Sequence, residues 1–119
     1  MIYTVTLNPS MDFFVDLEEL VIGELNRMSN DYKVPGGKGI NISRVLRQLG
    51  MPSVATGFIG GYTGQFIEDW LEREDIQRGF IHVDDDSRIN VKLLKQEETV
   101  INAKGPNVSV MEYQEFLYY

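Results

Sequence analysis

Three glycines fall within four positions of the segment VPGGKGINISRVLRQLG, residues 34–50. Apolar residues then recur near helical spacing at Ile40, Val45 and Leu49, and Gly50 stands where a helix end favours glycine. Glycines that open a helix let a ligand approach the backbone, and they leave the free N–H groups of the first turn available to an anion. The segment therefore predicts either a ligand-binding loop at a helix N-terminus or, from the glycine pair alone, a tight turn.

Two common nucleotide-binding loops do not fit this segment. A Walker A loop needs Ser or Thr after its lysine, but Lys38 is followed by Gly39. A dinucleotide loop needs its glycines directly after the first strand of the sheet, whereas here two further strands are expected in between. Both nucleotide-binding interpretations are therefore excluded.

The rest of the chain predicts an alternation of strands and helices. Buried strands are expected at residues 2–7, 52–59 and 80–83, because these runs are apolar and bounded by turn residues. A second helix is expected to begin at Thr63, its N-cap, and to bury Phe66, Ile67, Trp70 and Leu71. The order strand, helix, strand, helix, strand is typical of one half of a parallel α/β sheet.

A second group of strands is expected beside this sheet. Residues 88–104 read as a half-exposed hairpin with a polar turn at residues 96–98. Further strands are expected from Phe13 and over residues 25–32, followed by a loop at residues 34–37. Together they predict a β-flap.

Composition narrows the function classes. The net charge of −7 argues against binding to a nucleic-acid backbone, and the absence of cysteine excludes disulfides and zinc thiolate sites. There is no apolar run of membrane-spanning length and no signal peptide, which predicts a cytoplasmic protein with no membrane partner. Ser109 and Glu112 form a capping box for a helix that has no closing signal, so the chain is expected to be a fragment of something longer.

The glycine segment resembles the N-terminal signature of the PfkB/ribokinase family of sugar kinases. The positions that match are Gly36, Gly37, Gly39, Asn41, Ser43, Gly50 and Gly60. TLNPSMD (residues 6–12) is similar to the first-strand motif of the family's phosphosugar branch, and SRINVKL (87–93) and INAKGP (101–106) are similar to its flap and post-flap motifs. The resemblance covers nearly the whole chain but only the first two-fifths or so of a family member.

The resemblance implies an α/β, ribokinase-like fold: the N-terminal half of a doubly wound, mostly parallel sheet, plus a small β-flap or lid. Residues 1–119 would form one partial domain, with lid strands around residues 12–33 and 88–104. The implied reaction transfers the γ-phosphoryl group of ATP, with Mg²⁺, to a hydroxyl of a phosphosugar. Fructose 1-phosphate is the favoured acceptor and tagatose 6-phosphate the alternative, while TLNPSMD and RINVKL disfavour a nucleoside.

The resemblance also implies substrate-binding residues. Asp12 would accept hydrogen bonds from sugar hydroxyls, although an Asp after a turn is also a common Asx-turn residue. Gly36 and Gly37 would let the sugar lie against backbone N–H groups, and Asn41 would bind a hydroxyl. The substrate-binding set is completed by two cations for the phosphate, Lys38 and Arg88, with weaker candidates at Arg27 and Lys104. For each cation the alternative is an ordinary surface charge.

No catalytic residue and no metal ligand is expected in this chain. The family's catalytic base is an Asp in a Gly-Ala-Gly-Asp type motif near the C-terminus, and no similar segment occurs here. The acidic run at residues 84–86 reads as a solvated turn. ATP and Mg²⁺ are therefore expected only for a longer enzyme, and this chain alone would be inactive. The alternative is a non-catalytic, phosphosugar-binding or dimerising fragment, with a homodimer formed through the lid strands or the exposed sheet edge.

Overall fold

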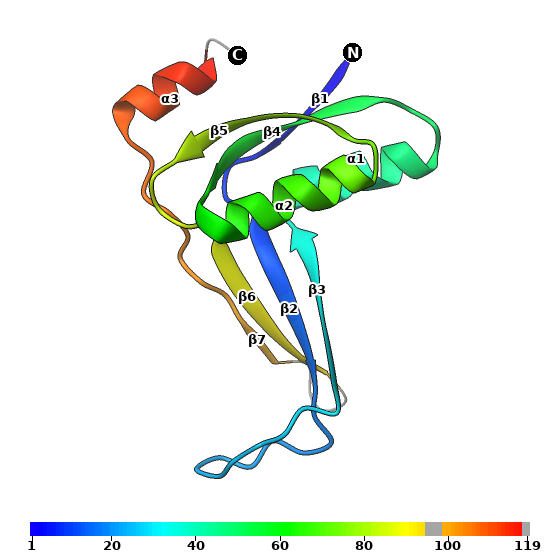
Figure 1. Cartoon of the computed structure of the whole chain (residues 1–119), viewed down its shortest axis with the longest axis vertical. Helices are drawn as coiled ribbons and strands as arrows, with labels where there is room; N and C mark the ends of the chain where they lie inside the picture. Colours follow the sequence, from blue (N-terminus) through cyan, green and yellow to red (C-terminus); the bar gives the residue numbers. More distant parts are fainter. Residues whose placement is uncertain (95–98, 118–119) are drawn as a thin grey trace.

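A three-stranded parallel sheet forms the first layer of the fold (Figure 1). The computed structural model describes residues 1–94 and 99–117. The strand order is β1-β4-β5, and each strand is joined to the next in the sheet by a connection that contains a helix. The elements of this layer are β1 (Ile2–Thr6), α1 (Lys38–Gln48), β4 (Ser53–Gly60), α2 (Gly61–Arg73) and β5 (Gln77–Val83).

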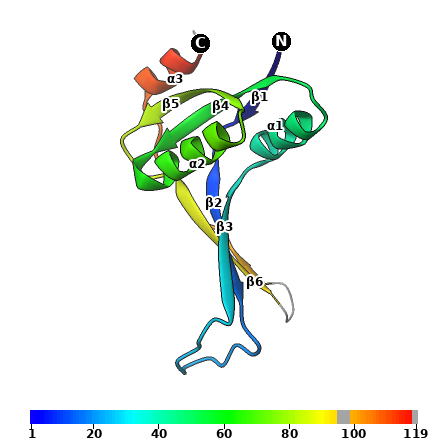
Figure 2. The ribbon, with the colours of Figure 1, turned by 45° about the vertical axis from the view of Figure 1, so that its right-hand side comes forward.

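A second sheet of four strands projects away from the first (Figures 1 and 2). Its order is β3-β2-β6-β7, with β2 and β6 parallel and the other neighbours antiparallel. Its strands are β2 (Ser10–Asp16), β3 (Asn30–Gly36), β6 (Arg88–Leu94) and β7 (Thr99–Ile101). The predicted fold class, half of a parallel α/β sheet with a small β-flap, is confirmed. The turn expected at residues 96–98 lies outside the described residues.

The core surrounds β4, the central strand of the first sheet. All eight of its residues are buried, because helices cover both faces of the strand. Ala55 and Ile59 face α1 and α2, where they pack in one cluster with Ile40 and Ile67. On the opposite face Phe58 packs against the last described helix, α3 (Val110–Leu117), with its ring 5.1 Å from that of Phe116.

Two helix ends follow the sequence expectations. At the end of α1, Gly50 has a φ of +77°, and its N–H donates to Arg47 while the Met51 N–H donates to Leu46. This is a Schellman motif, which requires the left-handed backbone that glycine adopts without strain. At α3, Glu112 N–H donates to Ser109 Oγ and Ser109 N–H donates to Glu112 Oε1, so the predicted capping box is confirmed.

The strand expected at residues 25–32 is wrong in its position. Strand β3 begins at Asn30 and continues to Gly36, so residues 34–36 are strand rather than loop. The reason is the pairing with β2, which runs without interruption from Asp16↔Asn30 to Ser10↔Gly36. Pairing across the sheet thus outweighs the turn-forming composition of Pro35 and Gly36.

Two further expectations need correction. Strand β1 is buried on one face only: it is an edge strand in which Thr4 and Thr6 are buried, while Tyr3 and Val5 are 59% and 51% exposed. Thr63 is not the N-cap of α2, because the helix begins directly after β4 and Gly60 takes that position. Thr63 Oγ1 instead donates to the Ser87 carbonyl at 2.6 Å, which ties α2 to the segment that leads into β6.

Replacing Gly57 with alanine tests the contact between β1 and β4. Gly57 has a φ of +148°, and a Cβ there would overlap the Thr6 carbonyl of β1. We expect Gly57→Ala to lower the free energy of unfolding by about 3 kcal/mol, since strain and overlap add. Gly50→Ala is the control, because its positive φ costs about 1 kcal/mol but open space surrounds it. Urea denaturation measures both, and equal losses would contradict the prediction.

Candidate functional site

The candidate site lies where the two sheets meet. Strand β1 ends at Thr6, and residues 7–9 carry the chain into β2. At the same junction β3 ends at Gly36, and α1 begins after Gly37. Ligands of open α/β sheets bind at the carboxyl ends of the parallel strands, and this junction is the carboxyl end of β1.

Asp12 is the buried acid of this junction. It lies in β2 with only 7% of its surface exposed. Its Oδ1 accepts hydrogen bonds from Ser10 Oγ at 2.6 Å and from Asn90 Nδ2 at 3.3 Å. Its Oδ2 lies 3.3 Å from the Lys92 ammonium. The carboxylate is therefore held in one orientation by three neighbours from β2 and β6.

The three glycines serve close contacts within the chain. A Cβ on Gly36 would occupy the space of the Asp12 carboxylate. A Cβ on Gly37, where φ is +121°, would lie 2.5 Å from Thr6 Cγ2, and one on Gly39 would lie 2.5 Å from Thr6 Oγ1. Each glycine thus admits a group from β1 or β2 against the start of α1.

The first turn of α1 presents two of the predicted residues to solvent. Lys38 opens the helix and Asn41 follows in its first turn, and both side chains are exposed. No side chain caps the helix through Gly37, and no acidic residue lies in the first turn. The Ile40 N–H donates to Thr6 Oγ1 at 3.0 Å, which satisfies one of the free donors. The first turn itself therefore adds a lysine and no carboxylate to the positive end of the helix dipole.

Arg88 and Lys104 are connected through Asn8. Arg88 opens β6 opposite Ser10, and its Nε donates to the Asn8 carbonyl at 3.1 Å. The Asn8 side-chain amide donates to the Lys104 carbonyl at 3.0 Å, while the Lys104 side chain is exposed. Asn8 alone therefore positions both Arg88, the predicted flap arginine, and the backbone of Lys104, the predicted post-flap lysine.

Arg27 is not brought to this junction within the chain. It lies in the segment between β2 and β3, before β3 begins at Asn30. Asp12 pairs with Val34, which is four residues, about 13 Å, from that start of the strand. Arg27 is therefore farther from Asp12 than the length of this part of β3. The other predicted residues, Gly36, Gly37, Lys38, Asn41 and Arg88, lie at the junction with Asp12.

Sequence reasoning missed the polar residues that hold Asp12. Asn90 pairs directly with Asp12 across β2 and β6, and its Oδ1 also accepts the Ala103 N–H at 3.0 Å. Lys92 follows two positions later on the same face, where its ammonium also lies 5.1 Å from the centre of the Phe14 ring. The signal was the polar alternation of Arg88, Asn90 and Lys92 in the flap motif, since alternate residues of a strand share one face.

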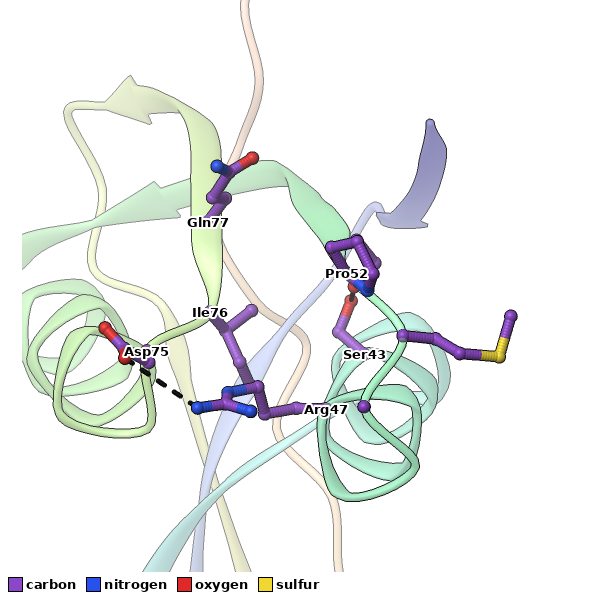
Figure 3. A pocket seen from close by; sticks show the side chains of 9 residues that line it. Ser43, Arg47, Pro52, Asp75, Ile76 and Gln77 are labelled. Carbon is purple, nitrogen blue, oxygen red and sulfur yellow. Dashed lines mark hydrogen bonds and ion pairs between the residues drawn. The ribbon is translucent and has the colours of Figure 1, made fainter.

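A hollow lies in the first layer, away from the junction (Figure 3). Its volume is about 230 Å³, and it is lined by residues of the end of α1 and the starts of β4 and β5. Arg47 and Asp75 form an ion pair of 3.7 Å there, with both side chains largely exposed. This hollow lies at the amino ends of β4 and β5, opposite the end where such sheets bind ligands, so we place the site at the junction.

Residues 1–94 and 99–117 contain no group of three or more His, Cys, Asp or Glu side chains placed to hold a metal ion. Over the same ranges, no helix has both the length and the apolar character needed to cross a membrane.

Comparison with known proteins identifies relatives over nearly the whole chain. The model of the pfkB family of carbohydrate kinases matches residues 5–119. The chain is 50% identical over 117 residues to a 1-phosphofructokinase of Bacillus subtilis, covering 98% of this chain and 39% of the relative. It is 43% identical to a D-tagatose-1-phosphate kinase of Bacillus licheniformis and 38% identical to a tagatose-6-phosphate kinase of Staphylococcus epidermidis, in each case covering 98% of this chain and 38% of the relative.

Solved structures agree with these relatives. A Staphylococcus aureus protein provisionally assigned as a phosphofructokinase is 50% identical, with a TM-score of 0.94, over 99% of this chain and 39% of that one. Phosphofructokinase-2 of Escherichia coli, solved with substrates and products, is 26% identical with a TM-score of 0.90, over 97% and 38%. The chain therefore spans less than two-fifths of the length of these relatives.

The ion pair at Asp12 can be tested against a matched exposed pair. Lys92→Met would leave a carboxylate that is nearly buried without its cation, so we expect a loss of about 1–2 kcal/mol in the free energy of unfolding. Lys33→Met is the control: Lys33 also pairs with a carboxylate and lies over a phenylalanine ring, but its ion pair is exposed on both sides. We expect the control to lose less than about 0.5 kcal/mol in urea denaturation. Equal losses would show that Lys92 does not neutralise Asp12.

Proposed function

Because the chain belongs to the pfkB family of carbohydrate kinases, we propose that it is the N-terminal, phosphosugar-binding portion of an ATP-dependent sugar-phosphate kinase. The observation that carries this proposal is the Asp12 carboxylate, which Ser10, Asn90 and Lys92 hold in one orientation at the carboxyl end of β1. A fixed acceptor beside an open helix N-terminus suits a ligand with both hydroxyl and phosphate groups.

Each residue has a role in this proposal. Asp12 accepts hydrogen bonds from sugar hydroxyls, and Asn41 donates to or accepts from another hydroxyl. The backbone of Gly36 and Gly37 lies against the sugar. Arg88 binds the phosphate with its guanidinium, whose Nε is already fixed on the Asn8 carbonyl.

Three further cations are weaker candidates than Arg88 for binding the phosphate. Lys38 supplies charge at the start of α1, and Lys104 lies on the segment that Asn8 holds. Arg27 is the weakest candidate, because its segment lies at the far end of the second sheet. A role for it within one chain would require the lid to fold over the junction.

The favoured substrate is fructose 1-phosphate. The INAKGP segment and the 1-phosphofructokinase of Bacillus subtilis, at 50% identity, support it, while tagatose 6-phosphate is the alternative. The reaction of the longer enzyme is transfer of the γ-phosphoryl group of ATP, with Mg²⁺, to the 6-hydroxyl, which gives fructose 1,6-bisphosphate and ADP. We propose a cytoplasmic location, without nucleic-acid or membrane partners.

We assign ATP, Mg²⁺ and the catalytic base to the part of the relatives that lies beyond this chain. The family motif that carries the base, Gly-Ala-Gly-Asp, has no counterpart in the 119 residues. Loss of a general base alone costs a factor of about 10²–10⁴ in rate. The chain alone is therefore proposed to bind the acceptor sugar without transferring phosphate.

Calorimetric titration of the 119-residue chain tests the proposed acceptor site. Fructose 1-phosphate and tagatose 6-phosphate are titrated separately into the chain and into Arg88→Ala. We expect saturable binding of fructose 1-phosphate and at least a tenfold loss of affinity in Arg88→Ala, since a bidentate phosphate contact is removed.

Arg27→Ala is the matched control, because it removes the same charge away from the junction and should change the affinity less than threefold. Equal losses in both variants would reduce the role of Arg88 to net charge. If circular dichroism shows a folded chain and neither sugar binds, the 119 residues do not form an acceptor site by themselves.

A homodimer formed through the lid is the second candidate function. Several large apolar side chains of the segment between β2 and β3 are exposed, among them Ile22 at 92%, Leu25 at 81% and Met28 at 51%. An exposed apolar patch of this kind is typical of a protein–protein interface. A related protein, phosphofructokinase-2 of Escherichia coli, has been solved in a tetrameric form; it is 25% identical with a TM-score of 0.84, over 97% of this chain and 39% of that one.

Ile22→Asp tests the lid as the dimer interface. We expect the wild-type chain to show a dimer mass in light scattering and Ile22→Asp to weaken dimerisation at least tenfold, because a charge replaces an exposed apolar contact. Val110→Asp, at 73% exposure on α3, is the control and should leave the dimer intact. A strictly monomeric wild-type chain would reject this candidate.

A further inference from the structure

We infer that Lys92 is a further substrate-binding residue of the acceptor site, and that its ammonium donates a hydrogen bond to a hydroxyl of the sugar. This hydroxyl lies next to the one that Asp12 accepts. The inference rests on the acceptor site proposed above and deepens it, because it adds a residue that reads the sugar rather than its phosphate.

The Asp12 carboxylate has one oxygen with room for a further hydrogen bond. Each carboxylate oxygen accepts about two hydrogen bonds. Ser10 Oγ and Asn90 Nδ2 both donate to Oδ1, so this oxygen is occupied. Oδ2 has the Lys92 ammonium at 3.3 Å, and it is the oxygen nearer to the place that a Cβ on Gly36 would take. A hydroxyl that Asp12 accepts beside the Gly36 backbone is therefore bound by Oδ2, next to Lys92.

The Lys92 side chain reaches this oxygen over an aromatic support. Lys92 pairs with Phe14 across β6 and β2, and this is the next pair on the same face after Asp12 and Asn90. The ammonium lies 5.1 Å from the centre of the Phe14 ring. That ring is stacked on Tyr32, with 4.7 Å between the ring centres and an angle of 8° between the planes. Lys92 is therefore held back towards Asp12 by a fixed ring rather than extended into solvent.

The ammonium has donors left for a ligand. It carries three N–H groups, and one of them is directed at Asp12 Oδ2. The Lys92 side chain is 28% exposed, so the ammonium is accessible from the junction side of the lid. Because the ammonium and the bound hydroxyl share Oδ2, the hydroxyl on the next carbon of the sugar lies within reach of a remaining N–H group.

The pairing with Asp12 favours a hydroxyl over the phosphate as the partner of Lys92. A phosphate bound to this ammonium would lie close to the Asp12 carboxylate, and like charges at such a separation repel each other. A hydroxyl oxygen has no net charge and accepts from the ammonium without this cost. Arg88, whose Nε donates to the neutral Asn8 carbonyl, keeps its full charge for the phosphate.

Amine labelling of the wild-type chain tests the contact directly. The 119-residue chain is acetylated under limiting conditions without ligand, with saturating fructose 1-phosphate, or with inorganic phosphate, and mass spectrometry measures the labelling of each lysine. We expect fructose 1-phosphate to slow the labelling of Lys92 by roughly fivefold or more, because the amine is then covered and hydrogen-bonded, and inorganic phosphate to slow it less than about twofold.

Lys33 is the control within the same experiment. It also lies over a phenylalanine ring and beside a carboxylate, but it pairs with Phe13, whose side chain is on the opposite face of the second sheet from Asp12. Neither ligand should change the labelling of Lys33.

A matched pair of lysine variants measures what the contact contributes to binding. In calorimetric titration, Lys92→Met should weaken fructose 1-phosphate binding about tenfold or more, since a charged hydrogen bond is lost, and should change the affinity for inorganic phosphate less than about twofold. Lys33→Met makes the same substitution on the opposite face and should leave both affinities unchanged. Circular dichroism confirms that both variants are folded. Should Lys92→Met not fold, the labelling of the wild-type chain decides the question.

Three results would overturn the inference and leave the proposed function intact. These are Arg88-dependent binding of fructose 1-phosphate that does not protect Lys92, unchanged affinity in Lys92→Met, and equal protection of Lys92 by inorganic phosphate, which would make it a phosphate ligand. If the folded wild-type chain binds no fructose 1-phosphate, the proposed acceptor site and this inference both fail.

Discussion

The contact between Thr6 and the glycine turn is the constraint on which the rest of the structure depends. Thr6 ends β1, and its side chain fills the space that a Cβ on Gly37 or Gly39 would take, while its Oγ1 accepts the Ile40 N–H. Its carbonyl lies where a Cβ of Gly57 would be. One residue therefore fixes the start of α1, the approach of β1 to β4 and the point where the chain leaves one sheet for the other. Side chains at those glycines would separate these elements.

This contact also determines the electrostatics of the junction. Because β3 runs into α1 without an intervening loop, Gly36 is placed against the Asp12 carboxylate, and the helix N-terminus opens beside it. Asp12 would be costly to bury alone, and Ser10, Asn90 and Lys92 satisfy its two oxygens. A carboxylate fixed in this way would need no reorganisation to accept a hydrogen bond from the hydroxyl proposed above, which is the usual advantage of a preorganised site.

The sequence allowed the local features to be predicted, but not those that depend on pairing between distant segments. The α1 end at Gly50 and the capping box at Ser109 follow from residues a few positions apart, and both are confirmed. The start of β3 at Asn30 is set by its register with β2, and the network around Asp12 is set by the parallel pairing of β2 with β6, 78 residues away. The exposure of β1 was also missed, because its alternating pattern describes a covered strand equally well.

Two apolar surfaces stay uncovered at opposite ends of an elongated molecule: the lid segment, and the face of β1 that carries Tyr3 and Val5. The chain extends over 49 Å in its longest direction, with the lid segment at one end and β1 near the other (Figure 1). Partners at the two surfaces would therefore not compete for space. The lid surface is carried by the segment between β2 and β3, and it is the surface proposed above as the interface of a homodimer. The β1 surface combines a strand edge with an exposed sheet face, which suits the completion of a single folded unit. The junction that holds Asp12 lies between them, so an occupant of either surface would leave the polar network around Asp12 in place.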